Sequence, residues 1–197
     1  MGTTSKMNIP YPENNDFVAD GATNMKDIAD QVDAKTGLIL IETRSVSAVT
    51  ASNVDNVFSF KYETYLLSIR YQTSADNQIA YQNRVGGVDA ANNYNRQTLD
   101  VDSSSVAAGR ITGETSTPVL LPSNSVWSYA TIIISGPNLA QPTVFKTEMA
   151  RTVGAYTVPA INLRYANHST ATAYDGFRLF VATGTFTAQF SLYGMNK

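Results

Sequence analysis

From residue 38 onward, apolar and polar residues alternate along the chain in short runs. In residues 186–193 every second residue is Phe, Ala or Leu, and the residues between them are mostly Thr, Gln and Ser. A period of two places one side of an extended strand in a core and the other in solvent. The same alternation predicts strands at 65–72 and 79–85, and residues 127–134, apolar on both sides in their second half, are predicted to form a central strand.

Residues 177–181 alternate in the same way, and Ala182-Thr183-Gly184 separates them from the last run. This spacing predicts a β-hairpin in which Phe177 and Phe190 face the same core. Turn-forming Gly, Pro and Asn residues separate the other runs. About nine or ten short strands with such spacing favour a sandwich or barrel over a βαβ fold. The sequence therefore predicts a mainly β chain with a single antiparallel, jelly-roll-like β-sandwich over residues 37–197.

Residues 1–36 follow a different pattern. Residues 1–20 are polar, and the Pro10-Tyr11-Pro12 motif favours an extended backbone. Residues 21–34 are predicted to form one short helix, with Asp20 as its N-cap and Gly37 as its stop. Such a helix is marginal on its own in water, so its apolar stripe is expected to pack against the sandwich or against another chain. The stripe consists of Ala22, Met25, Ile28, Ala29 and Val32.

The N-terminal segment is therefore predicted to attach the protein to a partner. Its few apolar residues outside the helix are spaced to anchor an extended chain along a groove. Together with the larger residues of the helix stripe, they are the candidate attachment and oligomerisation residues. These candidates are Ile9, Tyr11, Phe17, Val18, Met25, Ile28 and Val32.

Composition narrows the possible partners. Only 15% of the 197 residues are charged, against about 25% in an average soluble protein, and 55 residues are Ser, Thr or Asn. The net charge of −2 argues against a nucleic-acid partner, because phosphate binding needs a basic face. No apolar run is long enough for membrane insertion. The N-terminus has no signal-like apolar region, so we expect synthesis in a cytoplasm.

Catalytic and metal motifs are scarce. The chain has no Cys and a single His, which excludes thiolate sites and His-pair metal sites. His168, in a polar stretch, is predicted to be a solvated loop residue rather than a general base. The pair Asp100 and Asp102 is predicted to be a solvated strand end rather than a cation site. We therefore expect no enzyme activity, no cofactor and no metal.

Aromatic residues leave one binding alternative open. Tyr94, Trp127 and Tyr129 could form a platform on which a sugar ring stacks. Rings of this kind more commonly fill the edge of a core and keep a polar tip in water. Trp127 is accordingly predicted to belong to the core.

Four stretches of the chain resemble small structural proteins of tailed-bacteriophage virions, described as tail-fibre or minor structural proteins. The likeness rests on the Pro10-Tyr11-Pro12 arm with its short helix, the Gly86-Gly87 turn and the terminal strand that ends in Tyr193-Gly194. It covers residues 9–37, 54–66, 84–97 and 186–197. The resemblance implies a non-enzymatic protein without cofactors, located in the virion and made in the cytoplasm of the bacterial host.

The resemblance leaves several roles open. The first is a tail-fibre or tail-tip module, anchored by residues 1–36 to other virion proteins and exposing the sandwich. Its Ser-, Thr-, Asn- and Gly-rich loops would suit a host-surface glycan or protein. The second is a capsid decoration or head-fibre protein. Two alternatives lie outside the resemblance: a soluble carbohydrate-binding sandwich not tied to a virion and, last, a depolymerising enzyme. By the same resemblance a homo-oligomer is expected, with a trimer favoured.

Overall fold

A computed structural model of the chain describes residues 2–3, 10–11, 23, 25–30, 37–102, 105–124, 126–153 and 158–195. Contacts within the chain divide it into a small unit, Met1–Ile39, and a large unit, Leu40–Met195. In the small unit, β1 (Gly2–Thr3) pairs antiparallel with β2 (Pro10–Tyr11). Residues 25–30 are helical. The extended backbone predicted at Pro10 and Tyr11 and the predicted short helix are thus confirmed at these positions.

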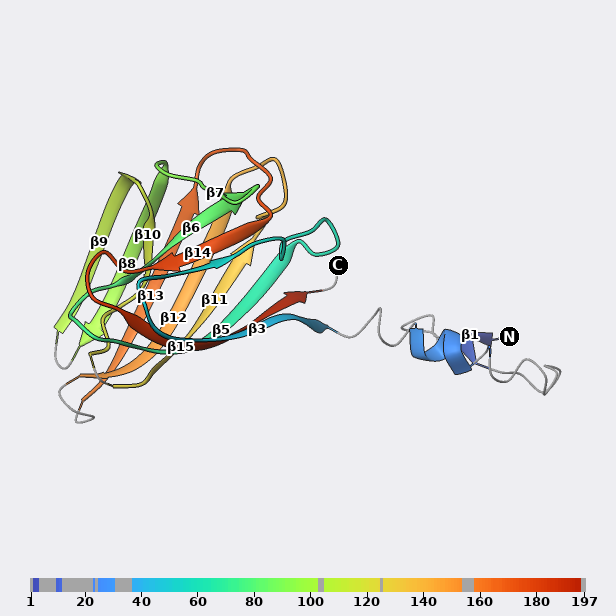
Figure 1. Cartoon of the computed structure of the whole chain (residues 1–197), viewed down its shortest axis with the longest axis horizontal. Coiled ribbons are helices and arrows are strands. Elements are labelled where there is room, and N and C mark those ends of the chain that lie inside the picture. Colours follow the sequence, from blue (N-terminus) through green and yellow to red (C-terminus); the bar gives the residue numbers. More distant parts are fainter. Residues whose placement is uncertain are drawn as a thin grey trace. The chain divides into compact units, whose positions relative to one another are not determined.

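The large unit is built on an eight-stranded sheet (Figure 1). The neighbouring strands from β15 to β9 all run antiparallel. Its strands, in spatial order, are β3 (Leu38–Val49), β15 (Phe186–Met195), β5 (Thr64–Thr73), β11 (Ser128–Ser135), β12 (Thr143–Val153), β13 (Val158–His168), β8 (Tyr94–Asp102) and β9 (Ser105–Glu114). The strand predicted at residues 127–134 is β11, and its central place in the sheet is confirmed.

A smaller antiparallel sheet packs over this one. Its path runs through four strands, and a fifth, short strand forms a hairpin with one of them. The four are β10 (Thr117–Leu120), β6 (Ile79–Val85), β14 (Gly176–Phe180) and β4 (Ala51–Val54), and the fifth is β7 (Val88–Asp89). The predicted antiparallel sandwich is therefore confirmed.

The order of the strands is that of a jelly roll. Eight positions follow one another along the chain: β4, β5, β6, β8, β9, β10, the meander β11–β13, and β14. The smaller sheet joins the first, eighth, third and sixth positions, and the larger sheet joins the second, seventh, fourth and fifth. Two four-stranded sheets wound in this order define a jelly roll. In this chain a three-stranded meander takes the place of the seventh strand, and β3 and β15 widen the same sheet.

The core lies between the two sheets and is rich in aromatic rings. Phe177 of β14 and Phe190 of β15 are both buried, with ring centroids 6.3 Å apart. Phe177 also stacks on Tyr81 of β6 at 5.5 Å. The prediction that Phe177 and Phe190 share one core is thus confirmed.

The predicted hairpin between these two strands is wrong. β14 pairs with β4 and β6 in the smaller sheet, whereas β15 pairs with β5 in the larger one. Gly184, at φ 72°, lies in the segment that carries the chain from one sheet to the other. Turn residues signal a change of direction but do not specify which sheet receives the next strand, so two strands that face each other across the core were assigned to one hairpin.

Candidate assembly surface

One end of the eight-stranded sheet has inverted polarity. In β13 the side chains of Asn162 and Arg164 face the interior and are buried, whereas Ile161 and Tyr165 on the other side are exposed. In β8, Leu99 likewise faces outward. Most strands bury their apolar side chains and expose their polar ones. A strand that does the reverse is unusual, and the exception points to a specific role for its outer face. This outer face of the sheet is the candidate functional surface.

Several polar groups on the inner side of these strands are paired. Asn162 Nδ2 donates to Asp100 Oδ1 at 2.9 Å, and Arg164 Nη1 donates to the carbonyl oxygen of Pro118 at 2.9 Å. Arg96 forms an ion pair with Glu114, with Nε and Oε2 2.7 Å apart. Hydrogen bonds offset much of the cost of burying polar groups, so these pairings make the inverted interior less costly. The apolar groups outside are the ones that lack a suitable environment.

The outward apolar residues form a continuous surface, which we call the apolar belt. Across the strands, Ile161 pairs with Val101 on one side and Ala150 on the other, Leu163 pairs with Leu99, and Val101 pairs with Val106. Ile161 is 59% exposed and Val106 is 70% exposed. The belt consists of Tyr129, Ile161, Leu163, Leu99, Val101 and Val106.

An aromatic and cationic cluster lies at the β11 end of the apolar belt. The guanidinium of Arg70 stacks on the Trp127 ring, 3.9 Å from its centroid, and lies 6.0 Å from the ring centroid of Tyr129. Tyr129 is 56% exposed. Trp127 is half-buried against Arg70, so its prediction as a core residue is wrong: the ring is partly covered by a charged side chain of the outer face. Trp, Tyr and Arg are the residues that dominate binding energy at protein interfaces.

Tyr94, Trp127 and Tyr129 do not form a joint platform for a sugar ring, because Tyr94 lies in the core. Tyr94 is fully buried, and its hydroxyl accepts from the amide of Asn83 at 2.8 Å and donates to the carbonyl oxygen of Ala90 at 3.0 Å. Burial raises the pKa of Tyr94, so its hydroxyl stays neutral. Trp127 and Tyr129 remain on the outer face, beside a shallow hollow of about 410 Å³ that Thr131, Glu148 and Ile161 help to line.

Strand β9 extends the sheet beyond the cover of the smaller sheet. The edge strand of that sheet, β10, contacts β8 and β12, and the side chains from Ser105 to Gly113 in β9 are exposed on both faces. Among the described strands, β9 pairs with β8 alone. A long, exposed edge strand presents unpaired backbone groups to any chain that can add a strand.

His168 is a core residue, and its prediction as a solvated loop residue is wrong. It ends β13 and is 1% exposed, because its strand continues into the sandwich where the polar sequence suggested a loop. Its Nδ1 lies 2.9 Å from the Tyr174 hydroxyl, and its ring centroid lies 4.4 Å from that of Tyr94. Burial lowers the pKa of His168 below its usual 6.5, so the folded protein keeps the ring neutral at pH 7.

This burial predicts that the protein becomes less stable in mild acid. His168 binds a proton near pH 6.5 in the unfolded chain and only at lower pH in the folded protein. The free energy of unfolding is therefore highest above pH 6.5 and falls as the pH drops below it. The fall is expected to approach about 1.4 kcal/mol per pH unit at its steepest. Denaturant unfolding of the parent and of His168→Phe at pH 7.5, 6.5 and 5.5 measures it. The variant should lose the decline, and equal slopes in both proteins would show that another group is responsible.

A network of charged side chains surrounds Arg84 in the smaller sheet. The Arg84 Nε donates to Asp55 Oδ1 at 2.7 Å, its Nη1 pairs with Asp89, and Arg178 reaches the second Asp89 oxygen at 2.6 Å. Burial alone lowers the pKa of Arg84, but the hydrogen bonds and charges of Asp55 and Asp89 outweigh it and raise the pKa above its ordinary value. The network connects the β6–β7 hairpin to β14 and to the segment after β4, and it has the character of a structural clamp.

Other candidate chemistry from the sequence has a structural explanation. Asp100 and Asp102 both lie in β8, as predicted, and Asp100 is held by Asn162 rather than free at a solvated end. Among the described residues, no three His, Asp or Glu side chains gather as metal ligands. None of the described helical segments has the length and hydropathy of a membrane span.

The predicted attachment residues fall mostly outside the described part of the chain. Tyr11 lies in β2, Met25 is 72% exposed on the helix, and Ile28 is half-buried. The apolar stripe is therefore open to solvent at Met25. The remaining candidates, Ile9, Phe17, Val18 and Val32, lie outside the described residues.

Comparison with known proteins adds no family to this description. No protein-family model and no curated protein sequence matches the chain.

Proposed function

We propose that this chain is a non-enzymatic structural protein of a tailed-bacteriophage virion. In this role residues 1–36 attach the protein to other virion proteins, and the jelly roll assembles with its neighbours and faces the host as a tail-fibre-like module. The virion location comes from the resemblance of the four sequence stretches. The assembly role comes from the molecule itself.

The observation that carries the assembly role is the inverted polarity of strands β13 and β8. A sandwich that works as a single free copy gains nothing by placing Ile161 and Leu99 in water while Asn162 and Arg164 occupy its interior. Large exposed apolar surfaces on soluble proteins mark interaction sites. A subunit of a particle has such a surface because another subunit covers it.

The small unit supports an attachment role. It is a separate unit of the chain, and Met25 on its helix is exposed. An apolar stripe on so short a helix needs a partner to be stable. The same organisation fits a capsid decoration or head-fibre protein, so electron microscopy of particles has to decide the position on the virion.

Removing residues 1–36 is expected to leave a folded sandwich that no longer enters virions. The test replaces the natural gene in the phage with the truncated one and measures copy number by mass spectrometry of purified particles. A Met25→Asp, Ile28→Asp double variant should show the same loss, because charge on the stripe opposes burial. The control Asp27→Asn, exposed on the same helix, should enter at the normal copy number.

Two results would count against the proposal. Absence of the full-length protein from purified particles would refute a virion role altogether. Normal incorporation of the truncated protein would place attachment on the sandwich. Electron microscopy of particles that carry a tagged full-length chain then distinguishes the tail from the shell.

A further inference from the structure

We propose that the apolar belt, whose residues lie on strands β11, β13, β8 and β9, is covered by a second copy of this chain. This inference rests on the proposed assembly role and names the partner of that surface. It is carried by the register that joins Tyr129, Ile161, Leu99 and Val106 into one outward surface.

The extent of the surface fits a stable pair of subunits. Five neighbouring strands, spaced 4.7–4.9 Å apart and about nine residues long, form a face of roughly 24 Å by 30 Å, or about 700 Å². The apolar belt crosses this face, with one or two residues on each strand that contributes to it, and polar side chains such as Gln97 and Lys146 occupy other outward positions. A standard protein interface buries about 800 Å² on each partner. The face is therefore large enough for a partner of the size of this sandwich, and larger than a short peptide would need.

The charges favour another copy of the same surface. The six residues of the apolar belt carry no charge themselves. Glu148 of β12 lies opposite Leu163, within the span of the belt, and pairs with Lys146 at 2.7 Å. Arg110 of β9 lies opposite Gln97. Both signs are thus present beside the belt, and a neighbouring copy can bring a cation against the carboxylate. The net charge of −2 adds little repulsion between copies.

The edge of the sheet adds a second means of contact in the same place. Strand β9 adjoins the apolar belt, is exposed on both faces and contributes Val106 to it. Ala107 and Ala108 have small side chains and Gly109 has none, which lets another backbone or sheet approach closely. Because the belt and the edge strand are continuous, one neighbouring copy can cover both.

The test compares the association of the full chain and its variants by sedimentation equilibrium at a series of concentrations. The parent is expected to form a defined oligomer. Ile161→Asp is expected to weaken association more than tenfold, because the change places a carboxylate in the centre of a dry interface. Ser45→Asp is the matched control: it adds the same charge at an exposed position of the same sheet, but on β3, the edge strand farthest from β9.

Val106→Asp is the second test variant. Val106 is on the exposed edge strand, so the monomer fold is expected to be unaffected, and circular dichroism with thermal unfolding checks this for each variant. A parent that stays monomeric at all concentrations would overturn the inference. So would association of Ile161→Asp and Val106→Asp with the affinity of the parent.

The result is independent of the virion test. A monomeric parent that still enters particles in normal number, while Ile161→Asp does not, would assign the apolar belt to a different virion protein and overturn self-association alone. An oligomeric parent that is absent from particles would overturn the proposed function and leave the self-association interface standing.

Discussion

Phe190→Ala is expected to lower the free energy of unfolding by about 3–5 kcal/mol, the usual cost of truncating a buried Phe. Phe190 is 2% exposed and lies across the core from Phe177, so its removal opens a cavity between the two sheets. A loss of this size is a large part of the roughly 5–15 kcal/mol that stabilises a typical domain. It corresponds to a fall in melting temperature of about 6–20 °C. Thermal and denaturant unfolding of parent and variant measure it.

The matched control is Gln189→Ala on the same strand. Gln189 points out of the sheet, so its truncation is expected to change stability by less than about 0.5 kcal/mol. A shift of the strand by one residue would exchange the two positions. If Gln189→Ala proved costly and Phe190→Ala harmless, the register that pairs β15 with β5 would be wrong.

Arg84→Met is expected to cost about 3 kcal/mol of stability. Only 7% of the Arg84 side chain is exposed, and the substitution leaves the carboxylates of Asp55 and Asp89 without their common cation. Breaking a buried ion pair from one side is strongly destabilising because the remaining charge stays desolvated. The loss sits at the low end of the usual range because both carboxylates are partly exposed, and Arg178 still reaches Asp89.

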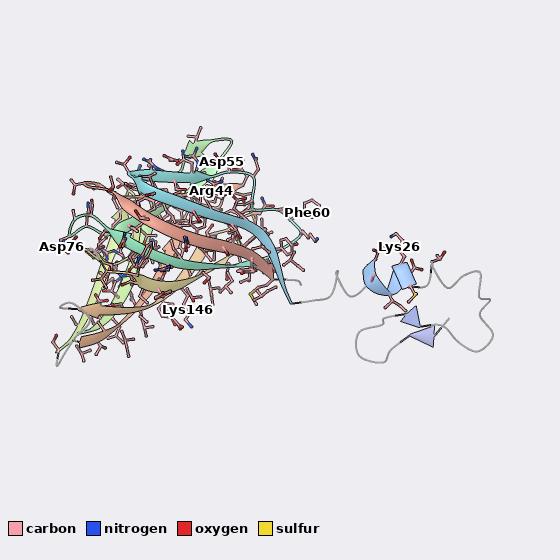
Figure 2. The ribbon with its side chains drawn as sticks, turned by 60° about the horizontal axis from the view of Figure 1, so that its bottom comes forward. Lys26, Arg44, Asp55, Phe60, Asp76 and Lys146 are labelled. Atoms are coloured by element: carbon pink, nitrogen blue, oxygen red, sulfur yellow. The ribbon has the colours of Figure 1, made fainter. Side chains whose placement is uncertain are left out.

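Arg44→Met provides the comparison. Arg44 pairs with Glu42 at 2.9 Å on β3, but its side chain is 34% exposed, and exposed pairs contribute less than about 1 kcal/mol. Figure 2 labels both Arg44 and Asp55, a partner of Arg84. Denaturant unfolding in low and high salt separates the two cases. Equal losses of unfolding free energy in the two variants would show that the Arg84 network stabilises the protein no more than an exposed ion pair does.

Much of the sandwich could be predicted from the sequence because the alternation is regular where one face is dry. Residues 186–192 follow it without exception, and the buried and outward sides of β15 agree with it. Connection between strands was harder to predict. The segment around Gly184 reads as a hairpin turn, yet the pairing of its flanking strands is decided by distant partners in β4, β6 and β5.

The candidate assembly surface could not be predicted, because alternation identifies two sides of a strand and not which side is covered. In residues 158–168 the apolar positions alternate with Asn162, Arg164 and His168. The ordinary rule places the apolar side in the core, and the structure places it outside. The sequence did contain one signal of this inversion. In one long strand, a side with Ile, Leu and Tyr lies opposite a side that combines Asn, Arg and His. The prediction for His168 was wrong for a related reason: His168 is the last residue of this strand, and the polar sequence around it suggested a loop.

The outer face of β11, β13, β8 and β9 is expected to be buried when the protein is assembled. Hydroxyl-radical footprinting of the native full chain measures this directly, by the oxidation of Tyr129 relative to Phe60. Phe60 is 84% exposed and lies in the β4–β5 connection, outside the apolar belt. Figure 2 shows it well separated from Lys146 of the outer face. Phe60 thus serves as an internal reference.

In a single copy Tyr129 is 56% exposed, and it should be oxidised readily in the dissociated Ile161→Asp variant. In the parent, at concentrations where it is assembled, oxidation of Tyr129 is expected to fall severalfold while that of Phe60 is unchanged. Equal oxidation of Tyr129 in the assembled parent and in the Ile161→Asp variant would refute assembly through this face, because it would show that the outer face of the sheet stays in water.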